Sequence, residues 1–405
     1  MSLMKVVVLA LAPLPGHPQG VASYTAPLAD HLAASGLEVK VWAQRDVARR
    51  QTGREHTVPV WRPGFLLGLD LLRELRRSRP DILHVQFEFG IYGGVPGLVS
   101  LLGALALSRV VFRQSIIVTS HQVLAFHDLT SDTLRQFGIR LPPWAARIVF
   151  RFVVMILGRC SDRVIVHGEV FRERLLTEWG LPSRLVRVVP HGAPQTDRPP
   201  SFEDRRLLLF GYIKRYKGIE NAIEAFRRLA GEFPEWTLTI AGKAASDEYL
   251  QELRALARPL GPQVEFTGYV EEGEVGEVLE RAAIVLLPYR TLFSSSGPMA
   301  DAIGHHKPFV ISEELRPLCP SWPFWCELSP ERWAHTLRGL MRDEGLRAQA
   351  GRMAGRLAED RRWPVVAAQT AHIYRQISGD QHEPGGPEVA RPQNASHSQA
   401  PNLSS

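Results

Sequence analysis

The chain has 405 residues, of which 45% are hydrophobic and 22% are charged, a composition typical of a soluble globular protein with room for two domains. Its formal net charge of +6 favours a partner that carries phosphate, whether a nucleotide, a nucleic acid or an anionic membrane surface. The three cysteines are an odd number without metal-ligand spacing, which argues against a disulfide framework and favours a reducing compartment.

The first half of the chain has the pattern of a doubly wound sheet. Residues 5–12 are predicted as an apolar strand, followed by a loop rich in proline and glycine, a helix at 24–34 and a second strand at 37–43. In such sheets ligands bind beyond the carboxyl ends of the strands. Gly20 therefore faces the predicted ligand crevice, although its loop lacks the full spacing of a dinucleotide fingerprint.

Two further strand ends carry candidate ligand contacts. The strand at 82–86 is followed by Glu88, a carboxylate that is flanked by aromatic residues and followed by glycines. The strand at 116–120 ends at His121, which we interpret as a candidate contact to a polar ligand. A lone histidine is more often structural, so this pattern alone leaves both interpretations open.

Three apolar stretches bear on membrane contact. The runs at 95–107 and 148–157 are shorter than the roughly 20 residues that a spanning helix needs, so no transmembrane anchor is expected. The stretch 144–159 has arginines between its apolar residues, which fits a core helix or a helix on a membrane surface, and we prefer the core helix. The run at 6–14 is predicted as a strand and not as a signal sequence.

The strand and helix pattern restarts after a polar, proline-rich linker at 195–203. A strand at 207–210 precedes a basic loop with Lys214, Arg215 and Lys217. Two later strands end at Gly242 and Tyr269, and two helices are predicted at 331–357 and 363–377. Two doubly wound units in succession would face one another across a cleft.

The stretch from 283 to 311 holds the clearest candidate anion site. It reads as a buried strand at 284–287, a loop with Ser295, Ser296 and Gly297, a helix and a strand at 309–311. Exposed backbone N–H groups at a helix start carry partial positive charge, and small residues let an anion approach them. An ordinary loop that caps a helix is the competing interpretation.

Taken together, these residues resemble the GT-B-fold glycosyltransferases of family 4, the retaining group 1 transferases. The segments that carry the resemblance run in order through most of the chain: 20–23, 84–94, 119–121, 190–194, 210–220 and 294–308. The resemblance implies an α/β fold in which two doubly wound, Rossmann-like domains face a central cleft. It places an acceptor domain at 1–200, a donor domain at 201–360, a helix packing back across the domains at 361–378 and a disordered tail at 379–405.

The implied activity is retaining transfer of a hexosyl group from a nucleotide-sugar donor to a glycan, lipid-linked or small-molecule acceptor, as in polysaccharide biosynthesis. No cofactor and no metal are expected, and no nucleic-acid partner. We expect a cytoplasmic location, and peripheral contact with the inner membrane face is left open. Base, sugar and acceptor are not specified by these residues.

The resemblance also implies roles for single residues. Lys217 would contact the donor diphosphate, Gly20 would lie against the phosphates from the other side, and His121 would touch the transferred sugar. His121, Lys217 and Glu88 are the predicted catalytic residues. The predicted donor-binding residues are Gly20, Lys214, Arg215, Gly242, Tyr269, Ser295, Ser296, Gly297 and Asp301.

The chain departs from the family pattern at two places. Tyr212 stands where the pattern has an arginine, so Lys214 or Arg215 would supply the charge. Of two glutamates expected eight positions apart, the first is replaced by Phe293 and the second by Asp301. These departures keep two alternatives open: a binding or partner subunit that has lost turnover, and an epimerase acting on a nucleotide sugar. His305 and His306 receive no assigned role.

Overall fold

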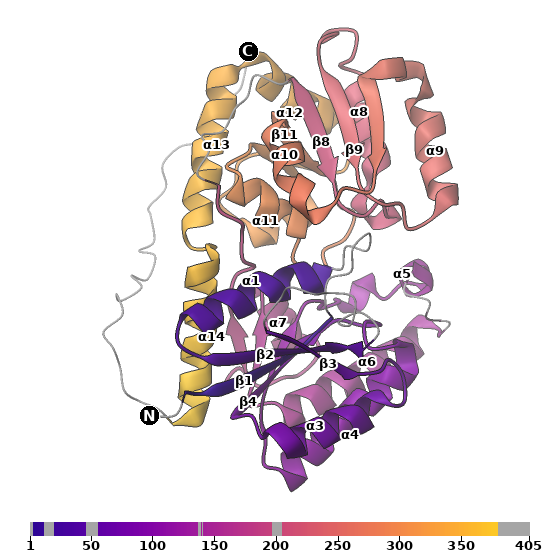
Figure 1. Cartoon of the computed structure of the whole chain (residues 1–405). Helices are drawn as coiled ribbons and strands as arrows, with labels where there is room; N and C mark the ends of the chain where they lie inside the picture. The colour runs from indigo at the N-terminus through magenta and orange to yellow at the C-terminus, as the bar shows by residue number, and fades with distance from the viewer. Residues whose placement is uncertain are drawn as a thin grey trace.

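The computed structural model describes residues 3–11, 20–45, 56–136, 139, 141–196 and 205–379. Most of the predicted linker and the predicted tail from residue 380 onward lie outside this part of the chain. Two domains are stacked one above the other, and two consecutive C-terminal helices run along one side, one beside each domain (Figure 1).

The N-terminal domain is built on a parallel sheet with the strand order β3-β2-β1-β4-β5-β6-β7. Its strands are β1 (Lys5–Leu9), β2 (Glu38–Gln44), β3 (Thr57–Trp61), β4 (Ile82–Phe87), β5 (Ser115–Ser120), β6 (Arg163–Val166) and β7 (Val186–Val188). Its helices are α1 (Gly20–Ala34), α3 (Leu67–Ser78), α4 (Gly94–Val111), α5 (Ser131–Gln136), α6 (Pro143–Cys160) and α7 (Glu169–Thr177). The central strands are buried along nearly their whole length because helices cover both faces of the sheet, and they are mostly apolar, with His84, Gln86 and Thr119 as buried polar exceptions.

The C-terminal domain repeats this plan with a parallel sheet of order β10-β9-β8-β11-β12-β13. Its strands are β8 (Arg206–Phe210), β9 (Thr237–Ala241), β10 (Val264–Gly268), β11 (Ile284–Leu287), β12 (Phe309–Ser312) and β13 (Trp325–Cys326). Its helices are α8 (Ile219–Arg227), α9 (Asp247–Ala257), α10 (Val275–Glu280), α11 (Gly297–Gly304), α12 (Pro330–Arg342) and α13 (Glu344–Glu359).

The last helix, α14 (Trp363–Ser378), returns to the N-terminal domain and packs against α1 (Figure 1). Its residues Trp363, Val366 and Tyr374 belong to the same core cluster as Val6 and Val8 of β1. Burying these side chains removes apolar area from water and ties the end of the chain to its first strand.

The prediction of one long helix at 331–357 was wrong. The chain leaves the helical conformation at Asp343, whose φ of −107° and ψ of 104° separate α12 from α13. The carboxylate of Asp343 accepts a hydrogen bond from the backbone N–H of Leu346 at 2.9 Å and so caps the second helix.

Candidate active site

A cavity of about 1190 Å³ lies between the two domains, at the carboxyl ends of their strands. Every predicted site residue except Arg215 lines it. Lys217 and Ser296, which the sequence places far apart, contribute to the same wall. The arrangement follows from two doubly wound sheets that both turn their ligand edges inward.

Lys217 is buried at the C-terminal side of the cavity. Its ammonium donates to the carbonyl of Phe210 at 3.3 Å and lies 5.4 Å from the ring centroid of Tyr289. Burial lowers the pKa of Lys217 to about 7, repulsion from Lys214 adds to the shift, and Asp301 opposes it. A bound anion would restore the charged form of this lysine.

The serine loop forms the start of α11 on the same wall. The Ser296 hydroxyl caps the helix by accepting from the backbone N–H of Met299 at 3.2 Å, and it contacts the Tyr289 hydroxyl at 3.1 Å. Space beside the Cα of Gly297 is open, so the helix start is accessible from the cavity. Burial raises the pKa of Asp301 to about 7, and Lys217 opposes this shift.

Glycines allow β8 and β9 to approach closely at the floor of the cavity. Gly242 has φ 147°, and a Cβ there would lie 2.1 Å from the carbonyl oxygen of Gly211. A Cβ on Gly211 would in turn lie 2.7 Å from the ammonium of Lys217. The lysine reaches its buried position because both residues lack a side chain.

The prediction that Arg215 lines the site is corrected by the geometry. Its guanidinium donates two hydrogen bonds to Glu252, at 2.6 and 2.7 Å, and stacks 4.6 Å from the ring centroid of Tyr249. The side chain therefore points to the outer surface, whereas Lys214 and Tyr212 line the cavity. Of the two cations offered as a replacement for the family arginine, only Lys214 is in position.

On the N-terminal wall, Glu88 is held by a residue that the sequence did not single out. The side-chain amide of Gln122 donates to the Glu88 carboxylate at 2.6 Å. Burial raises the pKa of Glu88 to about 7, and the charge of Lys214 opposes this shift. Gly20, at the start of α1, lines the same cavity with open space beside its Cα.

Buried hydrogen bonds fix the orientation of His121. The carbonyl of Val189 only accepts, so His167 Nδ1 donates to it at 3.0 Å and His167 Nε2 is left as an acceptor. His121 Nδ1 lies 3.3 Å from that nitrogen, and His121 Nε2 lies 2.8 Å from Gln86 Oε1, an amide oxygen that only accepts. Burial, with the neighbouring histidines, lowers the pKa of His121 well below its usual value. The ring is therefore a fixed, neutral part of the wall, and it is not suited to take up a second proton.

Phe293, which replaces the first family glutamate, joins the two domains. Its ring packs on Tyr216 at 4.8 Å between centroids, and its carbonyl accepts from the backbone N–H of Val123 at 2.7 Å. Gln122 and Ser294 form an antiparallel bridge beside it. An apolar side chain suits this position because it belongs to the core cluster shared by both domains.

Phe293, noted above for replacing a family glutamate, lines the cavity. Sequence patterns missed Gln122, Tyr289 and Trp363, which line it too. No local motif identifies them, because each reaches the site through the packing of distant segments. His305, left without a role, also lines the cavity, and its Nδ1 lies 2.9 Å from the carbonyl of Asp301.

Both halves of the chain match models of one group of enzymes. Residues 18–195 match the model described as Glycosyltransferase Family 4, and residues 204–321 match the one described as Glycosyl transferases group 1. The chain belongs to the GT-B-fold glycosyltransferases of family 4. Together the two matches cover most of both domains, so the family assignment includes both walls of the cavity.

Two curated relatives of this family 4 chain are informative. The glycogen synthase of Mycobacterium tuberculosis is 26% identical over 242 residues, which cover 56% of this chain and 57% of the relative. The phosphatidyl-myo-inositol mannosyltransferase of Mycolicibacterium smegmatis is 25% identical over 266 residues, which cover 64% and 65%. The matched part therefore spans less than two thirds of either relative.

The solved structure of Anabaena Alr3699/HepE in complex with UDP-glucose is similar to this family 4 chain with a TM-score of 0.69. The two are 16% identical, and the match covers 92% of this chain and 100% of that one. This likeness shows the shared GT-B fold. Among the described residues, no group of three or more His, Cys, Asp or Glu side chains is placed to hold a metal ion.

Proposed function

We propose that this chain transfers a sugar from a nucleotide-sugar donor to an acceptor, with retention of configuration and without a metal. The observation that carries the proposal is that Lys217 and the start of α11 share one cavity wall. A nucleoside diphosphate is the leaving group of such a transfer, and its negative charge grows as the bond to the sugar breaks. Fixed positive charge at that position lowers the barrier.

Lys217 is suited to this role by its burial. Its lowered pKa of about 7 means that the empty site holds the charged form with difficulty. A diphosphate beside it would favour the ammonium, so the interaction strengthens as charge develops on the leaving oxygen. The backbone N–H groups at Gly297 and the hydroxyls of Ser295 and Ser296 supply further donors.

The N-terminal wall is the proposed acceptor side. Glu88, oriented by Gln122 and with a pKa raised to about 7, would accept a hydrogen bond from an acceptor hydroxyl. Retention by attack from the front face needs that hydroxyl close to the leaving oxygen, which closure of the two domains would arrange. His121 would then contact the transferred sugar as a fixed neutral group.

The donor class has support from the solved relative, whose structure holds UDP-glucose. The names of the two reported relatives bear on the acceptor class in different ways, since one is a glycogen synthase and the other a phosphatidyl-myo-inositol mannosyltransferase. Because that solved structure holds UDP-glucose, we propose a nucleoside diphosphate hexose as the donor.

A thermal-shift screen with UDP-, GDP-, ADP- and TDP-sugars tests the donor class. A ligand at 100 times its dissociation constant stabilises the folded state by about 2.7 kcal/mol, so the correct base is readily distinguished. Incubation with the radiolabelled donor and an acceptor panel then tests transfer. Donor binding without transfer or hydrolysis across that panel would contradict the proposed activity.

Lys217→Ala tests the cavity wall, with Arg215→Ala as its matched control two residues away. Loss of the charge-assisted contact is expected to weaken donor binding by about 1–3 kcal/mol. Arg215→Ala should leave donor binding unchanged because this side chain pairs with Glu252 outside the cavity. Equal weakening in both variants, measured by calorimetric titration, would show a general effect of charge and would remove the proposed role of Lys217.

A further inference from the structure

The exposed apolar side chains of the described residues are concentrated on one layer of the N-terminal domain. With the exception of Leu3, every large apolar side chain that is exposed belongs to α3, α4 or α6 or lies within two residues of their ends. α4 packs between the other two helices. We call the outer surface of these three helices the apolar face. Contiguous surfaces of this kind mark interaction sites.

The middle helix has the most unusual outer surface. Val95, Val99, Leu107, Val110 and Val111 are exposed, and Val110 retains 78% of its accessible surface. The other fully exposed positions of α4 are glycines. α4 is the one helix among the described residues that is long and apolar enough to cross a bilayer, yet it packs against α3 and α6, and about a third of its residues are buried. It is therefore placed to lie along a membrane and not to span it.

α6 extends this surface and adds positive charge. Trp144, Ile148, Val149 and Phe152 are exposed, with Trp144 at 67%. Arginines alternate with them along the exposed side of the helix, at positions 147, 151 and 159. The sequence alone favoured a core helix here, but the structure shows that only one side of α6 is in the core.

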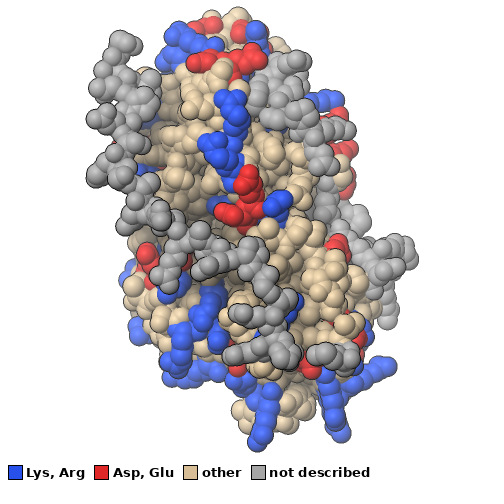
Figure 2. Space-filling view, turned by 90° about the vertical axis from the view of Figure 1, so that its left-hand side faces the viewer, with Lys and Arg blue, Asp and Glu red and all other residues tan. Residues whose placement is uncertain are grey.

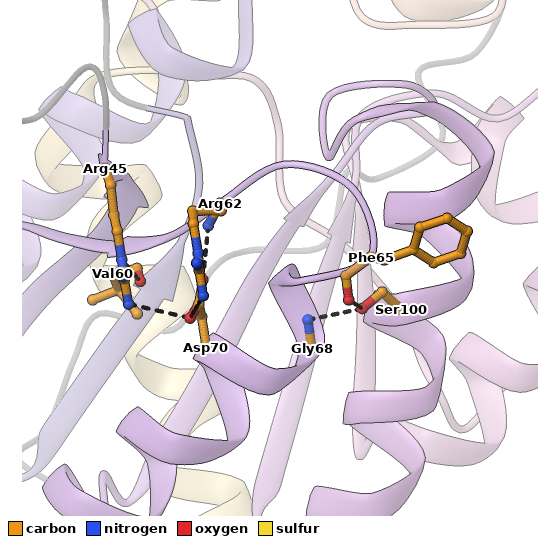
Figure 3. Close-up of polar contacts among 7 residues, drawn as sticks. All are labelled: Arg45, Val60, Arg62, Phe65, Gly68, Asp70 and Ser100. Carbon is orange, nitrogen blue, oxygen red and sulfur yellow. Dashed lines mark hydrogen bonds and ion pairs between the residues drawn. The ribbon is translucent and has the colours of Figure 1, made fainter.

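The loop before α3 presents a further aromatic side chain. Phe65 is 76% exposed, and its ring projects beside α4 (Figure 3). Ser100 of α4 fixes this loop by donating to the carbonyl of Phe65 at 2.7 Å and accepting from the N–H of Gly68 at 2.9 Å. The aromatic side chain is thus held outward by hydrogen bonds between two helices.

Acidic side chains are scarce on the three helices of the apolar face, where Glu74 of α3 is half-buried. Asp70 of α3 is fully buried and accepts hydrogen bonds from Arg62 at 2.8 Å and from Arg45 at 3.1 Å (Figure 3). The sequence has no Asp or Glu from 89 to 127 or from 133 to 161. Arg73, Arg76 and Arg77 are exposed at the far end of α3. Figure 2 shows basic side chains gathered over this lower end of the molecule, with fewer acidic ones.

We propose that the apolar face docks onto the surface of an anionic lipid bilayer. Valine, leucine and aromatic side chains would enter the boundary between headgroups and acyl chains, and the surrounding arginines would pair with anionic headgroups. A second copy of the chain fits less well, because two such faces would bring arginines against arginines without acidic partners.

The inner, buried side of α6 reaches toward the cavity. Phe150 of α6 packs on Phe89 with ring centroids 4.4 Å apart, and Phe89 lines the cavity on the acceptor side. If the proposed transfer is correct, an acceptor anchored in the bilayer would enter the cleft along this edge. Docking itself does not depend on the transfer activity.

Flotation of the full chain with vesicles tests the docking. Vesicles of phosphatidylcholine alone are compared with an equimolar mixture of phosphatidylcholine and phosphatidylglycerol. We expect binding to the mixed vesicles that weakens with salt. The double variant Val99→Asp with Val110→Asp should bind at least roughly tenfold more weakly, because both side chains leave water on docking.

The charge contribution is tested with Arg76→Ser and Arg77→Ser, where each substitution should weaken binding about fivefold. The matched control is Arg338→Ser with Arg342→Ser, two arginines on α12 of the other domain, which should bind as the unaltered chain does. Absence of binding to the mixed vesicles, or unchanged binding of the valine variant, would overturn the proposal. A dimer in sedimentation velocity that the valine variant disperses, without vesicle binding, would assign the face to a second copy instead. Donor binding in the thermal-shift screen reports separately on the proposed transfer.

Discussion

The two domains have the same sheet architecture but very different outer surfaces. Helices of the C-terminal domain carry exposed ion pairs, among them Arg228 with Glu331 and Arg338 with Glu232. Acidic and basic side chains lie together over the upper end of the molecule in Figure 2. α3, α4 and α6 of the N-terminal domain instead expose valine, leucine and aromatic residues with arginines and almost no acidic partners.

This difference shows which parts of the fold are constrained. Both sheets direct their strand ends into the cavity, and that requirement fixes the inner helices and loops. The outer helices need only cover the sheet, so their exposed sides can differ. In the C-terminal domain they suit water, and in the N-terminal domain they suit the membrane surface that we propose.

The largest expected effect is a loss of stability, and it compares a buried carboxylate of the N-terminal domain, Asp70, with an exposed carboxylate of the C-terminal domain, Glu252. Asp70→Ala removes the buried carboxylate that accepts hydrogen bonds from Arg62 and Arg45 and should lower the free energy of unfolding by about 1.5–3 kcal/mol, since both arginines stay in contact with water. Glu252→Ala removes an exposed partner of Arg215 in the C-terminal domain and should cost less than about 1 kcal/mol. Urea unfolding of both variants checks this, and similar losses would show that the two ion pairs do not differ as their burial indicates.

The next prediction distinguishes the two walls of the cavity by the pH dependence of two quantities, donor affinity and transfer rate. Lys217, with a lowered pKa of about 7, is charged below that pH, so donor affinity should be constant in acid and fall roughly tenfold per pH unit above 7. Glu88, with a pKa raised to about 7, is neutral below that pH, so transfer should increase as pH rises through 7. Donor titrations from pH 5 to about 9 would show the alkaline fall in affinity, and initial rates over the same range would show the acid limb, the increase in transfer rate through pH 7.

Two variants sharpen this assignment. Glu88→Gln should remove the acid limb of the rate profile while donor affinity keeps its alkaline fall. Lys217→Arg should remove the alkaline fall, because a guanidinium stays charged throughout this range. If the alkaline fall in affinity and the acid limb of the rate profile both persist in these variants, the titrating groups are not Lys217 and Glu88.

The smallest effect concerns one glycine from each wall. Gly242→Ala puts a Cβ against the carbonyl of Gly211 and should destabilise the C-terminal domain by about 1–3 kcal/mol. Gly20→Ala meets nothing within 4 Å at the start of α1 and should change stability by less than about 1 kcal/mol. If Gly20 lies against the donor phosphates, its variant will nevertheless bind the donor more weakly in calorimetry. Equal melting temperatures for the two variants would contradict the close approach of β8 and β9.

Much of the cavity could be predicted from the sequence because its residues follow directly after strands. The periodicity of apolar residues and the position of turn residues locate the ends of strands, and parallel strands bring their carboxyl ends to one edge of the sheet. Glu88 and His121 were selected in this way, whereas the role of Lys217 came from the resemblance to the family. Arg215 was misplaced by the same method, because position in a loop does not say which side of the chain an arginine occupies when Glu252 is available outside.

The sequence by itself determined two doubly wound units, the strand ends that meet ligand and the loop of small residues at the start of α11, since all of these depend on local periodicity and backbone freedom. Only the tertiary structure decided that Gln122 orients Glu88, that Phe293 joins the domains and that α3, α4 and α6 form one exposed apolar face. Each of these depends on which distant segments pack together, and a residue's own neighbours in the chain carry no record of the partners that the folded core supplies.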